Sequence, residues 1–173
     1  MNIKNIEIKA VYDDHDKSRL ILNSKNLDFM YMDFQIDTYF VVKDGRLKFR
    51  ESKLENSLIY YNREDKKEPK KSNVIICKNP DISLKDILMN SLGVLIRVEK
   101  KREIYILDNV KIHLDEVKDL GSFIEVEAMG KENDPEDYLL NECSYFIDLL
   151  DIKKENFISE SYSDLLIKKS NQR

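Results

Sequence analysis

Apolar and charged residues alternate along several segments of this chain. Residues 5–10 read Asn-Ile-Glu-Ile-Lys-Ala, and residues 46–50, 96–102 and 124–128 repeat the pattern. Successive side chains of a β-strand point to opposite faces, so each segment carries one apolar row and one charged row. A single strand of this kind has an ordinary solvated face. Recurrence in strand after strand, with both signs of charge, indicates a closed sheet whose polar interior binds a highly charged ligand.

The same patterning predicts eight strands, which is enough to close a barrel with a usable interior. We expect them at residues 2–11, 28–42, 46–51, 57–63, 74–77, 94–107, 110–116 and 122–129. Helical spacing predicts four helices: residues 13–25, residues 83–92, a helix that starts at residues 134–135 and runs to about residue 150, and a short helix in the tail.

Helix ends and turns have their own signals. Ser83 is expected to be an N-cap, and Gly93 ends that helix. Asp134-Pro135 is expected to start the third helix, with proline at its first position. Asp44-Gly45 and Asp108-Asn109 are typical of tight turns between antiparallel strands.

Composition agrees with one folded domain over residues 1–173. The chain has 42% hydrophobic residues, 36% charged residues and a mean hydropathy of −0.53, as expected for a soluble globular protein. No repeat or linker divides it. We therefore expect an α+β fold: an eight-stranded antiparallel closed β-barrel with a polar, charged lumen, flanked by four helices.

Several functional classes are disfavoured. A net charge of −4 and a pI near 5.4 give no general attraction to nucleic acid or to an anionic membrane. No apolar run approaches the roughly 20 residues of a membrane span, and the N-terminus begins in a strand pattern without a signal-peptide segment. Cys77 and Cys143 fit no metal-ligand spacing, and we expect both to be packing residues. A cytoplasmic protein is the expectation.

The charged rows predict a polyphosphate site. Six bases fall on them: Lys9, Lys48, Arg50, Arg63, Lys100 and Arg102. Four acids also fall on them: Glu7, Asp115, Glu125 and Glu127. Unpaired buried charges are costly, so this many bases in one lumen implies a bound polyanion. Arginine and lysine bind phosphate oxygens, whereas clustered carboxylates suit Mg²⁺ or Mn²⁺.

Each segment alone has a simpler interpretation. A pair such as Lys48 and Arg50 is usually a solvated strand surface, and residues 100–102 have charges on both faces. Glu125 and Glu127 lie opposite an apolar row, which shows only that the other face is buried. In all of these segments together, however, the charged residues alternate so that every charged row can face the same lumen. This joint occurrence favours the functional interpretation.

Eight short motifs follow one another along nearly the whole chain. They are Asn-Ile-Glu-Ile-Lys at 5–9, Gln-Ile-Asp-Thr-Tyr-Phe at 35–40, Gly-Arg-Leu-Lys-Phe-Arg-Glu at 45–51, Leu-Ile-Tyr-Tyr-Asn-Arg at 58–63, Val-Glu-Lys-Lys-Arg at 98–102, Leu-Asp-Glu-Val at 114–117, Leu-Gly-Ser-Phe-Ile-Glu-Val-Glu at 120–127 and Ser-Tyr-Ser-Asp-Leu-Leu at 161–166. Together they resemble the CYTH superfamily, the triphosphate tunnel metalloenzymes, and within it the class IV adenylyl cyclase-like branch.

This resemblance implies an antiparallel tunnel in which bases bind a triphosphate and acids hold a divalent metal. It assigns the triphosphate to Lys9, Lys48, Arg50, Arg63, Lys100 and Arg102, and Mg²⁺ or Mn²⁺ to Glu7, Asp115, Glu125 and Glu127. Asn5 stands where the family usually has Glu, and it brings a neutral oxygen instead of a charge.

The expected catalytic residues are Lys9, Arg63, Lys100, Arg102 and His113. His113 shares a strand face with Asp115, so it is either a general base or a structural hydrogen-bond partner of a carboxylate. Tyr39 and Tyr162 are expected to be packing residues.

Two reactions fit such a tunnel. The branch favours an adenylyl cyclase, which converts ATP to cyclic AMP and pyrophosphate; the alternative is a triphosphatase acting on tripolyphosphate, thiamine triphosphate or a nucleoside triphosphate. A non-catalytic polyphosphate-binding or nucleotide-binding module is the rival from another class. A nucleic-acid-binding barrel ranks last, because carboxylates interleave with the bases. The family includes dimers, and an exposed barrel flank could support a homodimer.

Overall fold

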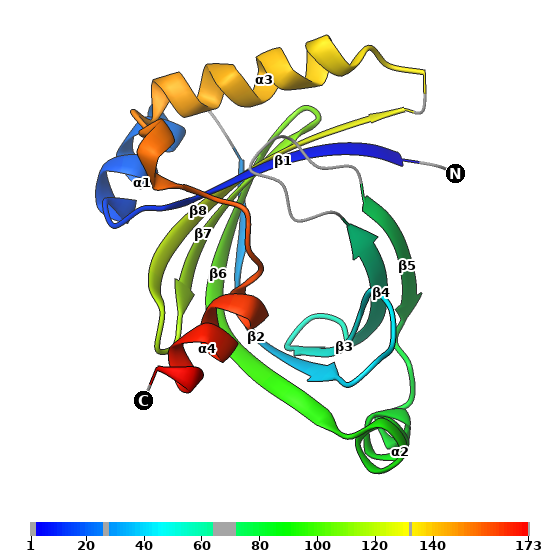
Figure 1. The fold of residues 1–173 in the computed structure, drawn as a ribbon. Helices are drawn as coiled ribbons and strands as arrows, with labels where there is room; N and C mark the ends of the chain where they lie inside the picture. The colour runs from blue at the N-terminus through cyan, green and yellow to red at the C-terminus, as the bar shows by residue number, and fades with distance from the viewer. Residues whose placement is uncertain (1–2, 26–27, 64–71, 132, 173) are drawn as a thin grey trace.

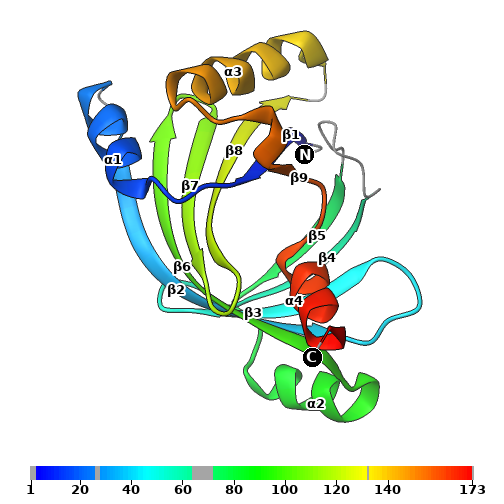
Figure 2. The same cartoon turned by 60° about the vertical axis from the view of Figure 1, so that its left-hand side comes forward.

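A single curled antiparallel sheet forms the body of the molecule (Figures 1 and 2). The computed structural model describes residues 3–25, 28–63, 72–131 and 133–172. Within them the sheet has nine strands in the order β5-β4-β3-β2-β6-β7-β8-β1-β9. The strands are β1 (Ile3–Val11), β2 (Asp28–Phe40), β3 (Arg46–Ser52), β4 (Ser57–Arg63), β5 (Ser72–Lys78), β6 (Val94–Leu107), β7 (Val110–Val117), β8 (Gly121–Lys131) and β9 (Phe157–Ile158). The helices are α1 (His15–Ser24), α2 (Ser83–Leu92), α3 (Glu136–Leu149) and α4 (Tyr162–Asn171), with a 3₁₀ turn, η1 (Lys154–Asn156).

The α+β class and the antiparallel, tunnel-like sheet are confirmed. Two details differ from the expectation. A ninth strand, β9, has only two residues and pairs with β1. The ladder is linear, with β5 and β9 at its two ends, so the described strands form a half-barrel and not a closed barrel.

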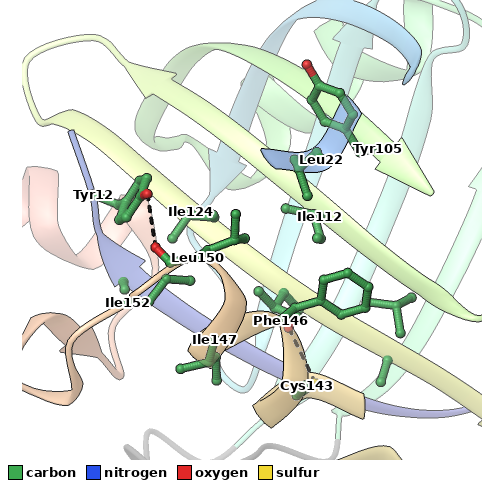
Figure 3. Close-up of a cluster of buried hydrophobic side chains, with 14 of the residues drawn as sticks. Tyr12, Leu22, Tyr105, Ile112, Ile124, Cys143, Phe146, Ile147, Leu150 and Ile152 are labelled. Carbon is green, nitrogen blue, oxygen red and sulfur yellow. Dashed lines mark hydrogen bonds between the residues drawn. The ribbon is translucent and has the colours of Figure 1, made fainter. Parts of the chain in front are cut away.

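The outer apolar rows of β1, β7 and β8 form the main core (Figure 3). Ile112 and Ile124 from the sheet pack with Leu22 of α1, with Phe146 of α3 and with Leu150 at the C-cap of α3. Because α1 and α3 cover this outer face, the charged rows of the same strands are left facing the inside of the curl. Packing on one face thus positions the candidate site on the other.

The predictions for helix starts and for the two cysteines were less accurate than the predictions for strands. α2 begins at Ser83 with Ile82 as its N-cap, so Ser83 is not the cap; the Asp81 carboxylate accepts the Ser83 N–H at 2.8 Å instead. Pro135 is the N-cap of α3 and not its first helical residue. Cys143 is buried as expected, but Cys77 is exposed on β5 and is not a packing residue.

The turn between β6 and β7 contains Asp108 at φ +51°, as the Asp108-Asn109 signal predicts. Among the described residues, no helix combines the length and apolar character that crossing a bilayer requires.

Gly45, in the turn between β2 and β3, is a conformational requirement that can be tested. Its φ is +69°, and a Cβ there would lie 2.8 Å from the Tyr60 hydroxyl oxygen. Gly93 also has positive φ, +79°, but a Cβ there would meet nothing within 4 Å. We expect Gly45→Ala to lower the free energy of unfolding by about 2 kcal/mol in the wild type and by about 1 kcal/mol in a Tyr60→Ala background, measured by urea denaturation. Equal losses would contradict a steric role of Tyr60.

Candidate functional site

Strand register brings the inner charged rows of β1, β6, β7 and β8 side by side. Lys9 lies opposite Glu125, and Arg102 lies opposite Asp115. Glu125 also lies opposite His113 on its other side. None of these five residues is more than 8% exposed. The rows that alternation placed on one face of each strand therefore meet inside the curl.

Three of the predicted phosphate ligands converge on the carboxylate of Asp37 in β2. Lys48 Nζ lies 2.8 Å and Lys100 Nζ 3.2 Å from Asp37 Oδ2. Arg50 contacts both oxygens, with Nε 2.6 Å from Oδ1 and Nη2 2.8 Å from Oδ2. Burial alone would raise the pKa of Asp37, but Arg50, Lys100 and Lys48 outweigh burial and hold that pKa well below its usual range. Three cations around one carboxylate make this wall net positive.

Asp37 is a site residue that sequence reasoning missed. Asp33, Gln35 and Asp37 form a buried polar row along the inner face of β2, while Phe34 and Ile36 point outward and are exposed. The same alternation that identified the bases was present here and could have revealed it. The number of buried bases alone therefore does not imply a bound polyanion. Acidic side chains in the lumen, Asp37 among them, already compensate the charge of these bases.

Arg102 lies between two of the predicted metal ligands. Its Nε and Nη2 donate to Asp115 Oδ1 and Oδ2 at 2.6 and 2.5 Å, and Nη2 also donates to Glu125 Oε2 at 2.6 Å. Lys9 Nζ is 2.9 Å from Glu125 Oε1. Burial would raise the pKa of Glu125, but Arg102 and Lys9 hold it well below its usual range. Asp115 and Glu125, predicted to bind a metal, are thus already paired with bases. Arg102, predicted to bind phosphate, already donates to these two carboxylates.

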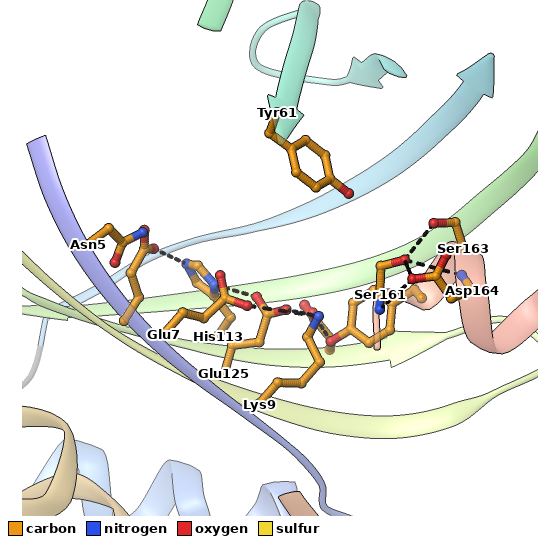
Figure 4. A network of polar contacts seen from close by, with 12 residues as sticks. Asn5, Glu7, Lys9, Tyr61, His113, Glu125, Ser161, Ser163 and Asp164 are labelled. Atoms are coloured by element: carbon orange, nitrogen blue, oxygen red, sulfur yellow. Dashed lines mark hydrogen bonds and ion pairs between the residues drawn. The ribbon is translucent and has the colours of Figure 1, made fainter. Parts of the chain in front are cut away.

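His113 lies between the carboxylates of Glu125 and Glu127 (Figure 4). Its Nδ1 is 3.1 Å from Glu125 Oε2, and its Nε2 is 4.0 Å from Glu127 Oε2. Asn5 Nδ2 donates to Glu127 Oε1 at 2.5 Å, and Asn5 Oδ1 is buried without a hydrogen-bond partner. The contact with Glu125 supplies the structural hydrogen bond that the sequence left open for His113; its action as a general base stays a prediction.

The corner formed by Glu7, Glu127 and Asn5 fits a divalent cation best. The two glutamates face each other across β1 and β8. They are the most accessible of the predicted metal ligands, with 26% and 19% of their side chains exposed. Carboxylate and amide oxygens are ligands that Mg²⁺ and Mn²⁺ prefer, and the orphaned Asn5 Oδ1 would gain a partner from such an ion. Within the described part of the chain, no three His, Cys, Asp or Glu side chains are already gathered as a metal site.

Tyr162, the first residue of α4, contacts side chains of the lumen. Its hydroxyl donates to Asp115 Oδ2 at 2.7 Å, and Lys9 Nζ lies 4.2 Å from its ring centroid. Burial, with the neighbouring carboxylates, raises the pKa of this hydroxyl well above its usual value, so it remains a neutral donor. An ion pair of 2.8 Å between Arg46 of β3 and Asp164 holds the start of α4 in place. Tyr162, expected only to pack, also belongs to the site.

We expect Tyr162→Phe to lower the free energy of unfolding by about 1–2 kcal/mol. The phenylalanine keeps the ring beside Lys9 but leaves Asp115 without one of its donors. Tyr145→Phe is the matched control, because Tyr145 is 54% exposed on α3. Urea denaturation compares the two variants, and identical stabilities would show that the Tyr162 hydroxyl contributes nothing.

The walls carry opposite net charge. Lys48, Arg50 and Lys100 surround one acid, Asp37, whereas the adjoining wall, which begins at Arg102 on β6, has twice as many acids as bases among its described residues: Glu7, Asp115, Glu125 and Glu127 with Lys9 and Arg102. Only the backbone of Arg63 is described, in β4, so its predicted role lies outside the described side chains. The lumen is therefore polarised from a cationic to an anionic side.

A curled antiparallel sheet around such a charged lumen defines a tunnel-type fold (Figure 2). The model of the CYTH domain matches residues 4–162, and the chain belongs to the CYTH domain family.

Known proteins of similar sequence and structure agree with that fold. The chain is 28% identical over 169 residues to a "Putative adenylate cyclase" of Methanocaldococcus jannaschii, covering 92% of this chain and 97% of that protein. It is similar to a conserved hypothetical protein from Pyrococcus furiosus, with a TM-score of 0.79, 20% identity and coverage of 93% and 99% of the two chains. A "Putative adenylyl cyclase" from Hippeastrum, which "reveals a dominant" triphosphatase activity, has a TM-score of 0.65 at 13% identity, covering 96% of each chain.

Proposed function

We propose that this protein is a metal-dependent enzyme that acts on a triphosphate bound between the two walls of the tunnel. The observation that carries the proposal is the convergence of Lys48, Arg50 and Lys100 on one buried point, beside a wall of carboxylates. Phosphate oxygens are the natural ligands of such a set, because ammonium and guanidinium groups donate charge-assisted hydrogen bonds to them. A bound phosphate would share these donors with Asp37.

The acidic corner would serve the metal. Glu7 and Glu127, with the Asn5 oxygen beside them, would hold Mg²⁺ or Mn²⁺. When bound, such an ion neutralises phosphate charge and stabilises charge on a leaving oxygen. The chain's own part is to orient: Arg102 fixes Asp115 and Glu125, and His113 fixes Glu125 from its other side.

The proposed reaction is cyclisation of ATP to cyclic AMP and pyrophosphate. It is supported by the adenylate cyclase name of the archaeal relative, which matches over almost its entire length. Triphosphate hydrolysis is the second candidate, favoured by the Hippeastrum protein of the same fold. Both reactions ask the same of the tunnel: to bind the phosphates and to stabilise developing charge.

A product-resolved assay separates the candidates. The purified protein is incubated with Mn²⁺ or Mg²⁺ and with ATP, tripolyphosphate or thiamine triphosphate, and products are separated by ion-exchange chromatography. Cyclic AMP with pyrophosphate supports the cyclase, and orthophosphate supports the triphosphatase. Tight triphosphate binding without any product would leave a binding module.

Glu127→Gln tests the metal corner. The substitution keeps the shape but removes one of the two accessible charges, so we expect the Mn²⁺ concentration for half-maximal activity to rise about tenfold or more. Mn²⁺ binding followed by electron paramagnetic resonance gives a readout independent of turnover. Glu116→Gln, on the exposed outer side of β7, is the matched control. An unchanged Mn²⁺ titration would remove Glu127 from the metal site.

A further inference from the structure

Gln35, on the inner face of β2, has a hydrogen-bond acceptor without a donor. The residue is buried, with 6% of its surface exposed. Its amide nitrogen Nε2 donates to Asp33 Oδ2 at 2.9 Å. Among the described residues, no group donates to its amide oxygen Oε1, which is itself buried. A buried acceptor without a donor destabilises a fold, and native structures keep few of them.

Asp33 fixes the orientation of the Gln35 amide. The Asp33 carboxylate also accepts from the Ser52 hydroxyl at 2.7 Å and from the Lys53 backbone N–H at 3.3 Å. A carboxylate has only acceptor oxygens, so it binds the NH₂ group of an amide and repels its carbonyl oxygen. The amide of Gln35 therefore cannot rotate to satisfy Oε1 at Asp33. This oxygen is left for a donor from outside the chain.

The acceptor lies directly beside the cationic wall. Gln35 pairs in register with Lys100 of β6 on one side and with Ser52 of β3 on the other. Asp37, the point on which the three bases of that wall converge, follows Gln35 by two residues on the same face of β2. Two strand residues span about 7 Å. One strand repeat thus separates the proposed phosphate position from Gln35.

The surroundings of Gln35 favour a neutral donor over a phosphate. Asp33 is only 2% exposed and brings a negative charge, and the Gln35 oxygen beside it is a second acceptor. Both repel phosphate oxygens, whereas a hydroxyl or an amine would donate to Gln35 Oε1. A triphosphate held at the cationic wall can therefore extend across the lumen but not along β2 past Gln35. The group bonded to the phosphates is the one that fits there.

The other direction along β2 is filled by side chains. Beyond Asp37, Tyr39 packs with Ile59, Tyr61 and Val98 in a buried cluster. The non-phosphate part of a substrate therefore has its polar partner on the Gln35 side. In a nucleoside triphosphate, the sugar is bonded directly to the α-phosphate and the base lies farther away. A sugar hydroxyl is thus the donor that one strand repeat brings within reach.

We infer that Gln35 Oε1 accepts a hydrogen bond from a ribose hydroxyl of the substrate, which makes that substrate a ribonucleoside triphosphate. The inference rests on the proposed function, because it requires a triphosphate at the cationic wall. Inorganic tripolyphosphate and thiamine triphosphate carry no such hydroxyl and leave the buried oxygen unsatisfied. A site built to bind a substrate hydroxyl discriminates strongly against analogues that lack it.

Isothermal titration calorimetry with ATP, 2′,3′-dideoxy-ATP and tripolyphosphate tests the inference. EDTA is present, so that binding is measured without metal-dependent turnover. We expect the wild type to bind ATP about tenfold or more tightly than dideoxy-ATP. Gln35→Met keeps the length of the side chain but removes the acceptor. This variant should bind ATP and dideoxy-ATP with equal Kd and tripolyphosphate with the Kd of the wild type.

Two control variants accompany Gln35→Met. Gln172→Met replaces an exposed glutamine near the C-terminus. Ser52→Ala removes a donor to Asp33 but leaves Gln35 Oε1 in place, so it separates loss of the acceptor from a change at Asp33. Both should keep the preference for ATP over dideoxy-ATP. Circular dichroism verifies folding, and the wild-type preference tests the inference even where Gln35→Met does not fold.

Three outcomes would overturn the inference alone. They are equal binding of ATP and dideoxy-ATP by the wild type, a Gln35→Met variant that keeps the preference, and thiamine triphosphate bound as tightly as ATP, which would assign the acceptor to an amine. Each leaves triphosphate binding and turnover intact. A wild-type chain that binds none of these triphosphates would instead contradict the proposed function, and the inference with it.

Discussion

Arg102→Met is expected to lower the free energy of unfolding by about 3–5 kcal/mol, because it leaves two buried carboxylates without their common partner. Asp115 is fully buried, Glu125 is 5% exposed, and the guanidinium of Arg102 contacts both at 2.5–2.6 Å. Lys9 remains beside Glu125 but cannot reach a bidentate geometry with Asp115. Urea denaturation at neutral pH measures the loss.

The pH dependence of stability should change sign in this variant. In the wild type, the depressed pKa of Glu125 gives stability that is present above its unfolded pKa of 4.5 and is lost as the pH falls through the folded pKa. Without Arg102, burial dominates and raises the pKa of both carboxylates, so acidification from about pH 7 to 5 should stabilise the variant.

Arg19→Met is the matched control for this experiment. Arg19 also contacts a glutamate with two donors, Glu103 at 2.9 and 2.8 Å, but its side chain is 30% exposed. Accessible ion pairs contribute about 1 kcal/mol or less. A loss in Arg102→Met no larger than in Arg19→Met, or stability that falls on acidification in both, would contradict the role assigned to Arg102.

The sequence predicted the inner rows because strand periodicity is a local property. Lys9 and Lys48 each alternate with apolar residues, and parity alone placed them on the face opposite the core; Lys100 lies between Glu99 and Lys101, so alternation by itself did not decide its face. The same reasoning gave the bounds of β4 and β6 without error. Every predicted ligand whose side chain the structure describes lies on the inner face.

Pairing between strands could not be derived in this way. That Lys48, Arg50 and Lys100 share Asp37 depends on the registers of β2 with β3 and with β6, which bring together residues 11 to 63 positions apart. The commitment of Arg102 to Asp115 depends likewise on the β6–β7 register. Alternation places a side chain on a face, but only register shows which charges cancel.

The tail and the barrel ends were the weakest predictions for a similar reason. β9 has two residues, too few for any periodic signal, and its place beside Lys9 and Ala10 of β1 is a tertiary contact. Tyr162 lies 47 residues from Asp115, and although it falls in the motif at residues 161–166, nothing local to α4 shows that its hydroxyl donates to Asp115. A sheet closes into a barrel only if its first and last strands pair with each other. The number of strands, which is what the sequence predicted, does not show whether they pair.

Lys100→Ala is expected to lower kcat/KM for the triphosphate substrate about 100-fold, because it removes one buried cation from the positive wall. Lys78→Ala is the matched control: Lys78 is a strand lysine with 70% of its side chain exposed, and its removal should leave kcat/KM unchanged. Circular dichroism of both variants verifies folding. Similar kinetics in the two variants would exclude Lys100 from the substrate site.

Lys100 should also impose a pH dependence on substrate binding. Burial, opposed by Asp37, lowers the pKa of Lys100 to about 8. A bound polyphosphate raises it again, so above pH 8 binding must take up a proton and the Kd should increase about tenfold per pH unit. Lys100→Arg keeps a permanent charge at this position, so the Kd should rise less steeply between about pH 7 and 9.5; the remaining slope comes from Lys48, whose pKa burial also lowers. Calorimetric titration with a non-hydrolysable triphosphate measures both curves, and equal slopes would show that another group titrates.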